Sequence, residues 1–243
     1  MTWSILARDE SGHFGVAIAS RFFAVGALCV HSRRGVGVVS TQALMNPLYG
    51  PAALDLLAQG KSAADTVAAL TAADAGRDQR QLHVLSAVGA GAAHTGASCV
   101  DWRGHQLHDN FSVAGNMLAG ADVIEATAQA FTATQGQPLA VRLLAAMAAG
   151  EAAGGDKRGK QSAALRIHGD EDYPQLDMRV DDHAEPIVEL QRLYQISLER
   201  FQPFAACLAG RNDPVGVTDR EQIDARIAQF QADAALRRSR GSQ

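Results

Sequence analysis

The chain opens with short apolar runs separated by polar turns. Thr2–Arg8 and Gly15–Ser20 are mainly apolar, and the polar segment Asp9–Gly12 between them is typical of a hairpin connection. A second pair of runs, Gly26–His31 and Gly35–Thr41, follows the same pattern. Polar and apolar residues do not alternate cleanly within these runs. We therefore expect strands that are covered on both faces.

Four later segments show helical spacing instead, with apolar residues recurring on one face: Pro51–Gln59, Ser62–Ala73, Asp122–Thr134 and Pro138–Ala149. Pro51 suits the first turn of a helix, where its missing N–H is not needed. Ser62 is a typical N-cap residue, and Asp65 follows it in the first turn. These segments predict two pairs of helices.

Short apolar runs return between and after the helix pairs: Gln81–Ala87, Ala92–Thr95, His105–Asp109, Phe111–Gly115, Ser162–His168 and Leu176–Val180. The pattern is helical again from Pro186 and over Ile223–Arg240. Groups of strands therefore alternate with helix pairs, which argues against the strand–helix–strand units of a doubly wound parallel sheet. We predict an α+β fold, a four-layer α/β/β/α sandwich of two antiparallel sheets, over residues 1–183, and a C-terminal helical extension over residues 184–243.

Composition narrows the class of protein. The 243 residues are 47% apolar and 20% charged, with a net charge of −4, which indicates one large folded domain, or one domain with a short appendage, and excludes disorder. No apolar run approaches the roughly 18 residues of a membrane span, and the mild acidity argues against nucleic acid as a partner. The first nine residues lack the pattern of a signal peptide. Three scattered cysteines suggest no disulfide framework, so we expect a cytoplasmic protein.

Thr2 carries the most specific chemistry in the sequence. If Met1 is removed, Thr2 becomes the first residue of an apolar strand, and its hydroxyl can act as a nucleophile with its own α-amine as the base. An α-amine titrates at about pH 7.7–8.0, which suits a general base. With Met1 attached, the Thr2 nitrogen is an amide and cannot act in this way. The alternative is that Thr2 is an ordinary strand residue.

The segment Gly154–Gln161 nearly matches a P-loop. Gln161 stands where a Ser or Thr should bind Mg²⁺, and a helix precedes the segment where a P-loop needs a strand, so we reject nucleotide triphosphate binding. A Gly-rich loop with cations and neighbouring polar side chains can still bind a substrate carboxylate. Its candidate residues, besides Lys157, Arg158 and Lys160, are Asp156, Gln161 and Ser162. A solvated surface turn is the alternative.

Histidines give no convincing metal site. His105 and His108 lie three residues apart in a predicted strand, so their side chains point to opposite faces. His183 follows two aspartates without a partner cluster. We therefore expect no metal and no cofactor. His31 and His94, near strand ends, are better candidates for contacting substrate, although each can equally be a structural histidine.

Amide side chains after two of the predicted strands suggest an oxyanion site. Gln42 and Asn46 follow the fourth strand, and Asn116 follows Gly115. Such amides can donate to an oxyanion, although Asn after Gly is also a common turn residue. Arg21 follows the second strand, where its side chain can reach Thr2 and favour deprotonation of the nucleophile. The alternative for Arg21 is a surface role.

Several ordered motifs resemble a bacterial and archaeal family catalogued as domain of unknown function 1028. The resemblance covers about residues 1–195 and rests on Thr2–Asp9, Gly15–Phe22, Thr41–Ala43, Asn46–Gly50, His94–Gly96, Gly115–Gly120, Gly154–Asp156, Arg158–Ala163 and Arg179–His183. The family looks like an N-terminal-nucleophile (Ntn) hydrolase in fold, which implies cleavage of a C–N amide bond by analogy. Some members carry a C-terminal extension described as peptidoglycan-binding, and the segment from Pro186 onward is similar to it.

Three functions remain open at this point. The first is an amidohydrolase acting on a small amide or short peptide, with Thr2 as nucleophile and Arg21 and Asn116 assisting. The second is a non-catalytic protein on the same fold that binds a small molecule, a peptide or a peptidoglycan fragment. The third is a structural homo-oligomer that packs through faces rich in alanine.

Overall fold

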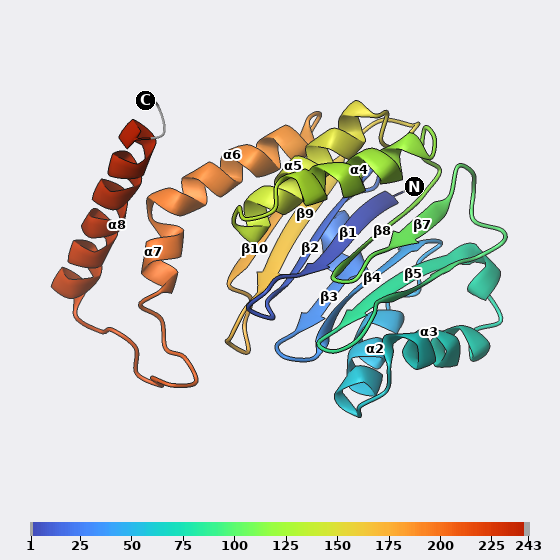
Figure 1. Cartoon of the computed structure of the whole chain (residues 1–243), viewed down its shortest axis with the longest axis horizontal. Coiled ribbons are helices and arrows are strands. Elements are labelled where there is room, and N and C mark those ends of the chain that lie inside the picture. Colours follow the sequence, from blue (N-terminus) through green and yellow to red (C-terminus); the bar gives the residue numbers. More distant parts are fainter. Residues whose placement is uncertain (1, 241–243) are drawn as a thin grey trace. The chain divides into compact units, whose positions relative to one another are not determined.

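The computed structural model describes the backbone of residues 2–240 and the side chains of residues 2–233 (Figure 1). The chain divides into two compact units after Leu190. The first unit contains all ten strands found in the described residues, in two sheets. All strand pairs are antiparallel.

The larger sheet has six strands in the order β10-β9-β2-β1-β8-β7. Its members are β1 (Thr2–Arg8), β2 (Phe14–Ser20), β7 (Gly104–Leu107), β8 (Phe111–Asn116), β9 (Ser162–His168) and β10 (Leu176–Val180). β1 is central, because β2 and β8 pair with its two edges along its length. The first residue of the described chain therefore lies within a sheet and not on a loose arm.

The smaller sheet has four strands in the order β3-β4-β5-β6. Its members are β3 (Val30–Arg33), β4 (Gly37–Ala43), β5 (Arg80–Ser86) and β6 (Ala92–Thr95). A short 3₁₀ turn, η1 (Arg77–Gln79), leads into β5. The inner faces of the two sheets meet through β1, β2 and β8 on one side and β4 and β5 on the other.

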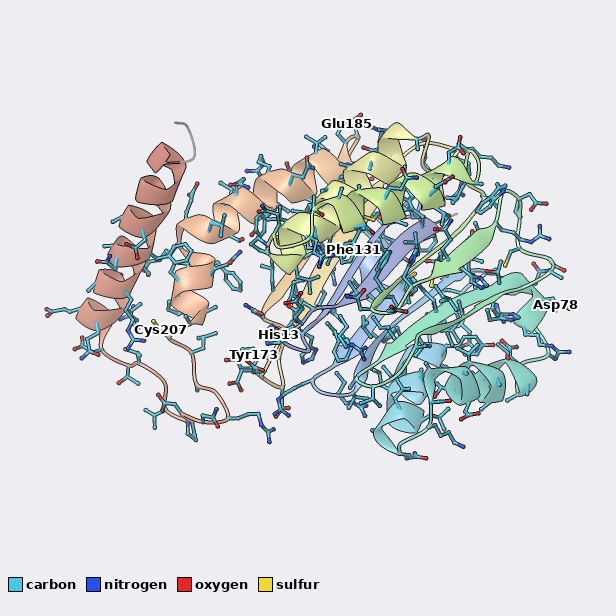
Figure 2. The ribbon with its side chains drawn as sticks, in the orientation of Figure 1. His13, Asp78, Phe131, Tyr173, Glu185 and Cys207 are labelled. Atoms are coloured by element: carbon cyan, nitrogen blue, oxygen red, sulfur yellow. The ribbon has the colours of Figure 1, made fainter. Side chains whose placement is uncertain are left out.

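Two helix pairs cover the outer faces of the sheets (Figure 1). They are α4 (Asp122–Ala133) with α5 (Leu139–Ala152) on the larger sheet, and α2 (Tyr49–Ala58) with α3 (Ala63–Ala72) on the smaller one. Phe131 of α4 points toward the sheet (Figure 2). Its ring centroid lies 4.9 Å from that of Phe111 on β8. These layers confirm the predicted four-layer α/β/β/α sandwich.

One predicted strand is wrong. The segment expected as a strand over Gly26–His31 forms helix α1 (Val25–Cys29) and then turns into β3. The hydroxyl of Ser162 accepts a hydrogen bond from the first N–H of α1, at Val25, over 3.1 Å. A Cβ on Gly26 would come within 2.3 Å of the Ala164 Cβ, so the helix packs directly on β9. A short apolar run buried on all sides fits either conformation, and hydrophobicity alone cannot separate them.

Other elements predicted from local sequence signals are confirmed. The runs Thr2–Arg8, Ala92–Thr95, Ser162–His168 and Leu176–Val180 are strands with the predicted bounds. The Ser62 hydroxyl accepts from the Asp65 N–H over 3.0 Å and caps α3. Capping by a side-chain oxygen satisfies one of the unpaired N–H groups of the first turn.

The second unit begins within α6 (Pro186–Glu199) and continues through α7 (Phe201–Ala205) and α8 (Arg220–Arg240). Within it, the Gln231 side chain donates to the Glu199 carbonyl over 2.7 Å, and Arg200 lies 3.4 Å from Asp224. Over the described residues, no helix is both long enough and apolar enough to cross a membrane.

Candidate active site

One end of the sandwich gathers polar residues from several strands. Thr2 begins β1 and lies directly opposite Asn116, the last residue of β8. Ser20 ends β2, Gln42 is next to last in β4, and Gln81 is second in β5. Because neighbouring antiparallel strands run in opposite directions, the start of one lies beside the end of the next. Residues that are far apart in the sequence therefore meet at this end.

Thr2 is buried, with 5% of its surface exposed. Its hydroxyl donates to the Ser20 hydroxyl over 3.1 Å. The register places Asn116 beside it on the same face of the larger sheet. The predicted nucleophile and the predicted oxyanion donor are therefore neighbours, and Ser20 is a third member that sequence analysis missed.

Gln81 is the centre of the hydrogen bonds behind Asn116, and sequence analysis missed it as well. Its Nε2 donates to the carbonyls of Gly104 (3.0 Å) and Gly115 (2.8 Å), and to the hydroxyl of Thr95 (2.9 Å). Its Oε1 accepts from Asn116 Nδ2 over 2.9 Å and from Gln42 Nε2 over 2.7 Å. Backbone carbonyls can only accept, so they determine which end of the Gln81 amide faces them. That choice in turn fixes the orientation of the other two amides.

The same reasoning assigns protons deeper between the sheets. Gln42 presents Oε1 to the Ser4 hydroxyl, which donates to it over 2.8 Å. Ser4 must then accept from Nε2 of His83, 2.7 Å away, so that nitrogen carries the proton. Nδ1 of His83 is left to accept from the Ser112 hydroxyl at 2.9 Å. Complete burial lowers the pKa of His83 to about 3, which keeps the ring neutral as this assignment requires.

Backbone strain occurs next to two of these amides. Ala43 follows Gln42 with φ 68°, and Met117 follows Asn116 with φ 53°. A residue other than glycine rarely adopts this left-handed conformation, which persists where the surroundings enforce it. Met117 N–H donates to the Val100 carbonyl over 2.8 Å. The strands β4 and β8 therefore end in constrained turns directly next to Gln42 and Asn116.

Arg21 and Asp156 join β2 to the Gly-rich loop. The Asp156 carboxylate, whose side chain is 1% exposed, accepts from the backbone N–H groups of Arg21 (2.9 Å) and Arg158 (2.8 Å). The guanidinium of Arg21 donates to the Arg158 carbonyl over 3.0 Å. The backbone of Gln161 also donates to the Ser20 carbonyl over 3.1 Å. These contacts hold the loop beside Ser20, whose hydroxyl accepts the hydrogen bond from Thr2.

The remaining loop residues make structural contacts. The Gln161 side chain donates to Asp182 over 3.1 Å, and Ser162, opposite Ser20, caps α1. Lys157 donates to the Asp101 carbonyl over 2.7 Å. The other two loop cations face carboxylates: Arg158 lies 3.3 Å from Asp156, and Lys160 contacts Glu151 and Glu185. All three cations proposed for a carboxylate ligand are thus already engaged within the protein.

Three other predicted residues lie in or beside the smaller sheet, away from the hydrogen bonds of Thr2. His31 contacts the Leu28 carbonyl through Nε2 at 3.0 Å, and burial lowers its pKa. Asn46 accepts from the Leu48 N–H over 3.1 Å. His94 contacts the Arg77 carbonyl at 2.9 Å. Each of these side chains contacts a backbone group of the smaller sheet or its connections, and the structure does not bring any of the three to Thr2.

Among the residues that the structure describes, metal-ligating side chains do not gather at this end of the sandwich. Across the described part of the chain, no three His, Cys, Asp or Glu side chains are placed to hold a metal ion. The arrangement offers instead a hydroxyl, a hydrogen-bonded hydroxyl partner and an amide of fixed orientation. These groups suit nucleophilic attack or the binding of a polar ligand.

Comparison with known proteins places the chain in a family. A crystal structure of a protein from Silicibacter pomeroyi, described as DUF1028, is 32% identical and superposes with a TM-score of 0.84 over 90% of this chain and 96% of that chain. Anbu, the ancestral beta-subunit from Yersinia bercovieri, is 11% identical with a TM-score of 0.40 over 81% of this chain and 94% of that chain. No curated protein matches. The family model of DUF1028, a family of unknown function, matches residues 2–190, and the chain belongs to this family.

Proposed function

We propose that the protein hydrolyses a C–N amide bond in a small metabolite or short peptide, with Thr2 as the nucleophile after Met1 is removed. The pairing of Thr2 with Asn116, together with the hydrogen bond from Thr2 to Ser20, carries this proposal. The resemblance of the family to Ntn hydrolases supports the same reaction by analogy.

The reaction follows from these positions. The α-amine of Thr2 takes the hydroxyl proton while Oγ1 attacks the amide carbon. Asn116 stabilises the oxyanion that forms, because Gln81 fixes the donor end of its amide and an amide nitrogen carries a second N–H. The C–N bond then breaks, the amine leaves with the proton, and an ester on Thr2 remains. Water hydrolyses the ester and restores the hydroxyl.

Replacement of Thr2 tests the proposal. The wild-type protein, its intact mass first confirming a chain that begins at Thr2, is assayed against amino-acid amides, N-acyl amino acids and dipeptides. Thr2→Ala should lower hydrolysis by at least about 10³-fold, whereas Thr2→Ser retains a hydroxyl and should keep part of the activity. Thr132→Ala is the matched control, because it makes the same change on the exposed face of α4. An active preparation that fully retains Met1 would refute the mechanism.

The burial of Thr2 favours a second candidate, a non-catalytic protein that binds a small amide, peptide or cell-wall fragment at the same end of the sandwich. Ligand binding that persists in Thr2→Ala, with no turnover by any wild-type preparation, would support binding over hydrolysis. A cytoplasmic location and assembly into a homo-oligomer stay predictions. Light scattering on the purified protein tests the latter, and a monomer would contradict it.

A further inference from the structure

A row of hydrogen-bonded side chains crosses the smaller sheet and continues into the larger one. Gln42, Gln81 and Thr95 are register partners on β4, β5 and β6. β6 is an edge strand of the smaller sheet, and β7 is an edge strand of the larger one. The Thr95 hydroxyl lies 2.9 Å from Nδ1 of His105 on β7. The row therefore bridges two sheet edges and ends in a partly exposed imidazole.

The hydrogen bonds of Gln81 assign the protons along this row. Two backbone carbonyls accept from its Nε2, so the same nitrogen also donates to Thr95 Oγ1 over 2.9 Å. The Thr95 hydroxyl can then donate to Nδ1 of His105, and a neutral ring carries its one proton on Nε2. Partial burial, and after it the charge of His94, lower the pKa of His105. Both effects favour the neutral ring that this assignment requires.

Protonation of His105 reverses the hydrogen bond at Thr95. The second ring proton can only go to Nδ1, which then donates, so the Thr95 hydroxyl hydrogen loses this acceptor. Nε2 of Gln81 has two hydrogens for three acceptors between 2.8 and 3.0 Å, and a change at Thr95 shifts their balance toward the two carbonyls. Oε1 belongs to the same planar amide and accepts from Asn116 Nδ2 over 2.9 Å. A proton on His105 therefore reaches Asn116 through two intervening side chains.

Few charges act on His105 from the elements around β7. β8 contains no charged residue, and His94 is the titratable residue of β6. The charged residues of α4 are Asp122 and Glu125, which are both exposed. His83 on β5 interacts electrostatically with His105, but burial lowers its own pKa to about 3 and keeps it neutral. The proton that mild acid adds to this row therefore goes to the imidazole at its end.

We propose that His105 is a positioning residue for Asn116: its neutral ring, acting through Thr95 and Gln81, holds the amide that stabilises the oxyanion, and protonation of the ring loosens that hold. The inference deepens the proposed function and rests on it only for the effect on hydrolysis. The coupling between His105 and Asn116 requires no turnover. A failure of the coupling is therefore distinguishable from a failure of the hydrolase proposal.

NMR titration of the full chain tests the coupling. The side-chain amide resonances of Asn116 and the ring resonances of His105 are followed from pH 8 to pH 4.5, and both should change with the same midpoint. In Thr95→Val the ring still titrates, but the shift of the Asn116 resonances should fall at least about threefold, because the hydrogen bonds through the hydroxyl are lost. A charge acting through space would leave that shift unchanged. Asn116 resonances that do not follow His105 in the wild type, or an equal shift in folded Thr95→Val, would overturn the proposal.

Two further variants control the titration. His105→Asn can present an acceptor oxygen to Thr95 but does not titrate, so the shift of Asn116 should disappear. His108→Asn makes the same change at an exposed position, where the ring stacks on Phe111 at 4.0 Å, and should leave the shift within about twofold of wild type. A thermal melt verifies that each variant folds. If Thr95→Val does not fold, Thr95→Ala replaces it, because it removes the hydroxyl without placing a methyl group against the imidazole.

The pH dependence of hydrolysis tests the consequence for the reaction. Protonation of the α-amine of Thr2 lowers kcat equally in all variants, so the ratio of kcat between His105→Asn and wild type isolates His105. This ratio should rise at least about threefold from pH 8 to pH 4.5, while the ratio for His108→Asn stays constant within about twofold. A constant ratio for His105→Asn would show that His105 does not position Asn116 during the reaction. Absence of turnover in every preparation would contradict the hydrolase proposal and leave the NMR result to decide the coupling.

Discussion

The layer between the two sheets has a polar half and an apolar half. Along β5 the residues that face the larger sheet change from Gln81 and His83 to Leu85. β1 shows the same change, from Thr2 and Ser4 to Leu6, and β4 does so from Gln42 and Ser40 to Val38. Leu6, Val38 and Leu85 belong to one buried cluster. The division therefore runs across strands from both sheets at a similar level.

Different interactions stabilise the two halves. Apolar side chains stabilise in proportion to buried area and tolerate changes of orientation. Buried amides and hydroxyls stabilise only when their partners are correctly placed, and each lost partner carries a penalty. The polar half therefore contributes a defined geometry at the end of the sandwich where Thr2 lies. The apolar half supplies the stability that such a site requires.

Replacing Gln81 should give the largest effect. Gln81→Leu keeps the size but leaves the Asn116 and Gln42 amides and the Gly104 and Gly115 carbonyls without this partner. At about 1–3 kcal/mol for each unsatisfied group, a loss of about 4 kcal/mol in the free energy of unfolding is expected. Leu85→Ala in the apolar half should cost about 3 kcal/mol. Urea denaturation measures both.

The contrast between the two halves is contradicted if the free energy of unfolding of Gln81→Leu lies within about 1 kcal/mol of the wild-type value while Leu85→Ala is clearly destabilised. The polar half would then rearrange freely, and the fixed orientation of Asn116 would have no basis. In the folded variant, the proposed hydrolysis should also fall, because Asn116 no longer has a fixed donor end.

The layers could be predicted from the sequence, but the network could not. Period and turn signals locate strands such as Thr2–Arg8, since these signals depend only on neighbouring residues. The prediction for the α1 segment is wrong because the conformation of this segment depends on Ser162 and Ala164, which lie far along the chain. Gln81 and His83 alternate with the apolar residues Leu82 and Val84 in β5, and that pattern was the available signal. Only the partner sheet reveals what they bind.

His83 should make the stability of the polar half depend on pH. The pKa of its ring falls to about 3 in the folded protein because of burial, against about 6.5 in an unfolded chain. Below about pH 6.5 the His83 ring binds a proton in the unfolded state but stays neutral in the folded state. The free energy of unfolding therefore decreases by up to about 1.4 kcal/mol per pH unit. The expected loss from this residue is about 1.6 kcal/mol between pH 6.5 and pH 5.

Comparison of wild type with His83→Gln isolates this effect. Burial also lowers the pKa of His31, His105 and His168, so these residues act in the same direction in both proteins. The variant should be less stable at pH 7 but should lose less stability on acidification. From pH 7 to 8 the difference between the two proteins should stay nearly constant, because the His83 ring is then largely neutral in the folded and the unfolded state. Parallel curves from pH 7 to 5 would show that His83 does not titrate in this way.

The smallest effect should come from Ser40, although it is fully buried in the same half. Its hydroxyl lies 3.3 Å from both Ser4 Oγ and Gln42 Oε1, whereas Ser4 reaches Gln42 Oε1 at 2.8 Å and His83 Nε2 at 2.7 Å. Ser40→Ala leaves the short bonds intact and should cost about 0.5 kcal/mol, against about 2 kcal/mol for Ser4→Ala, which removes a donor and an acceptor. Equal losses in urea denaturation would mean that the hydroxyls act as one unit, and bond length would then not rank their contributions to the polar half.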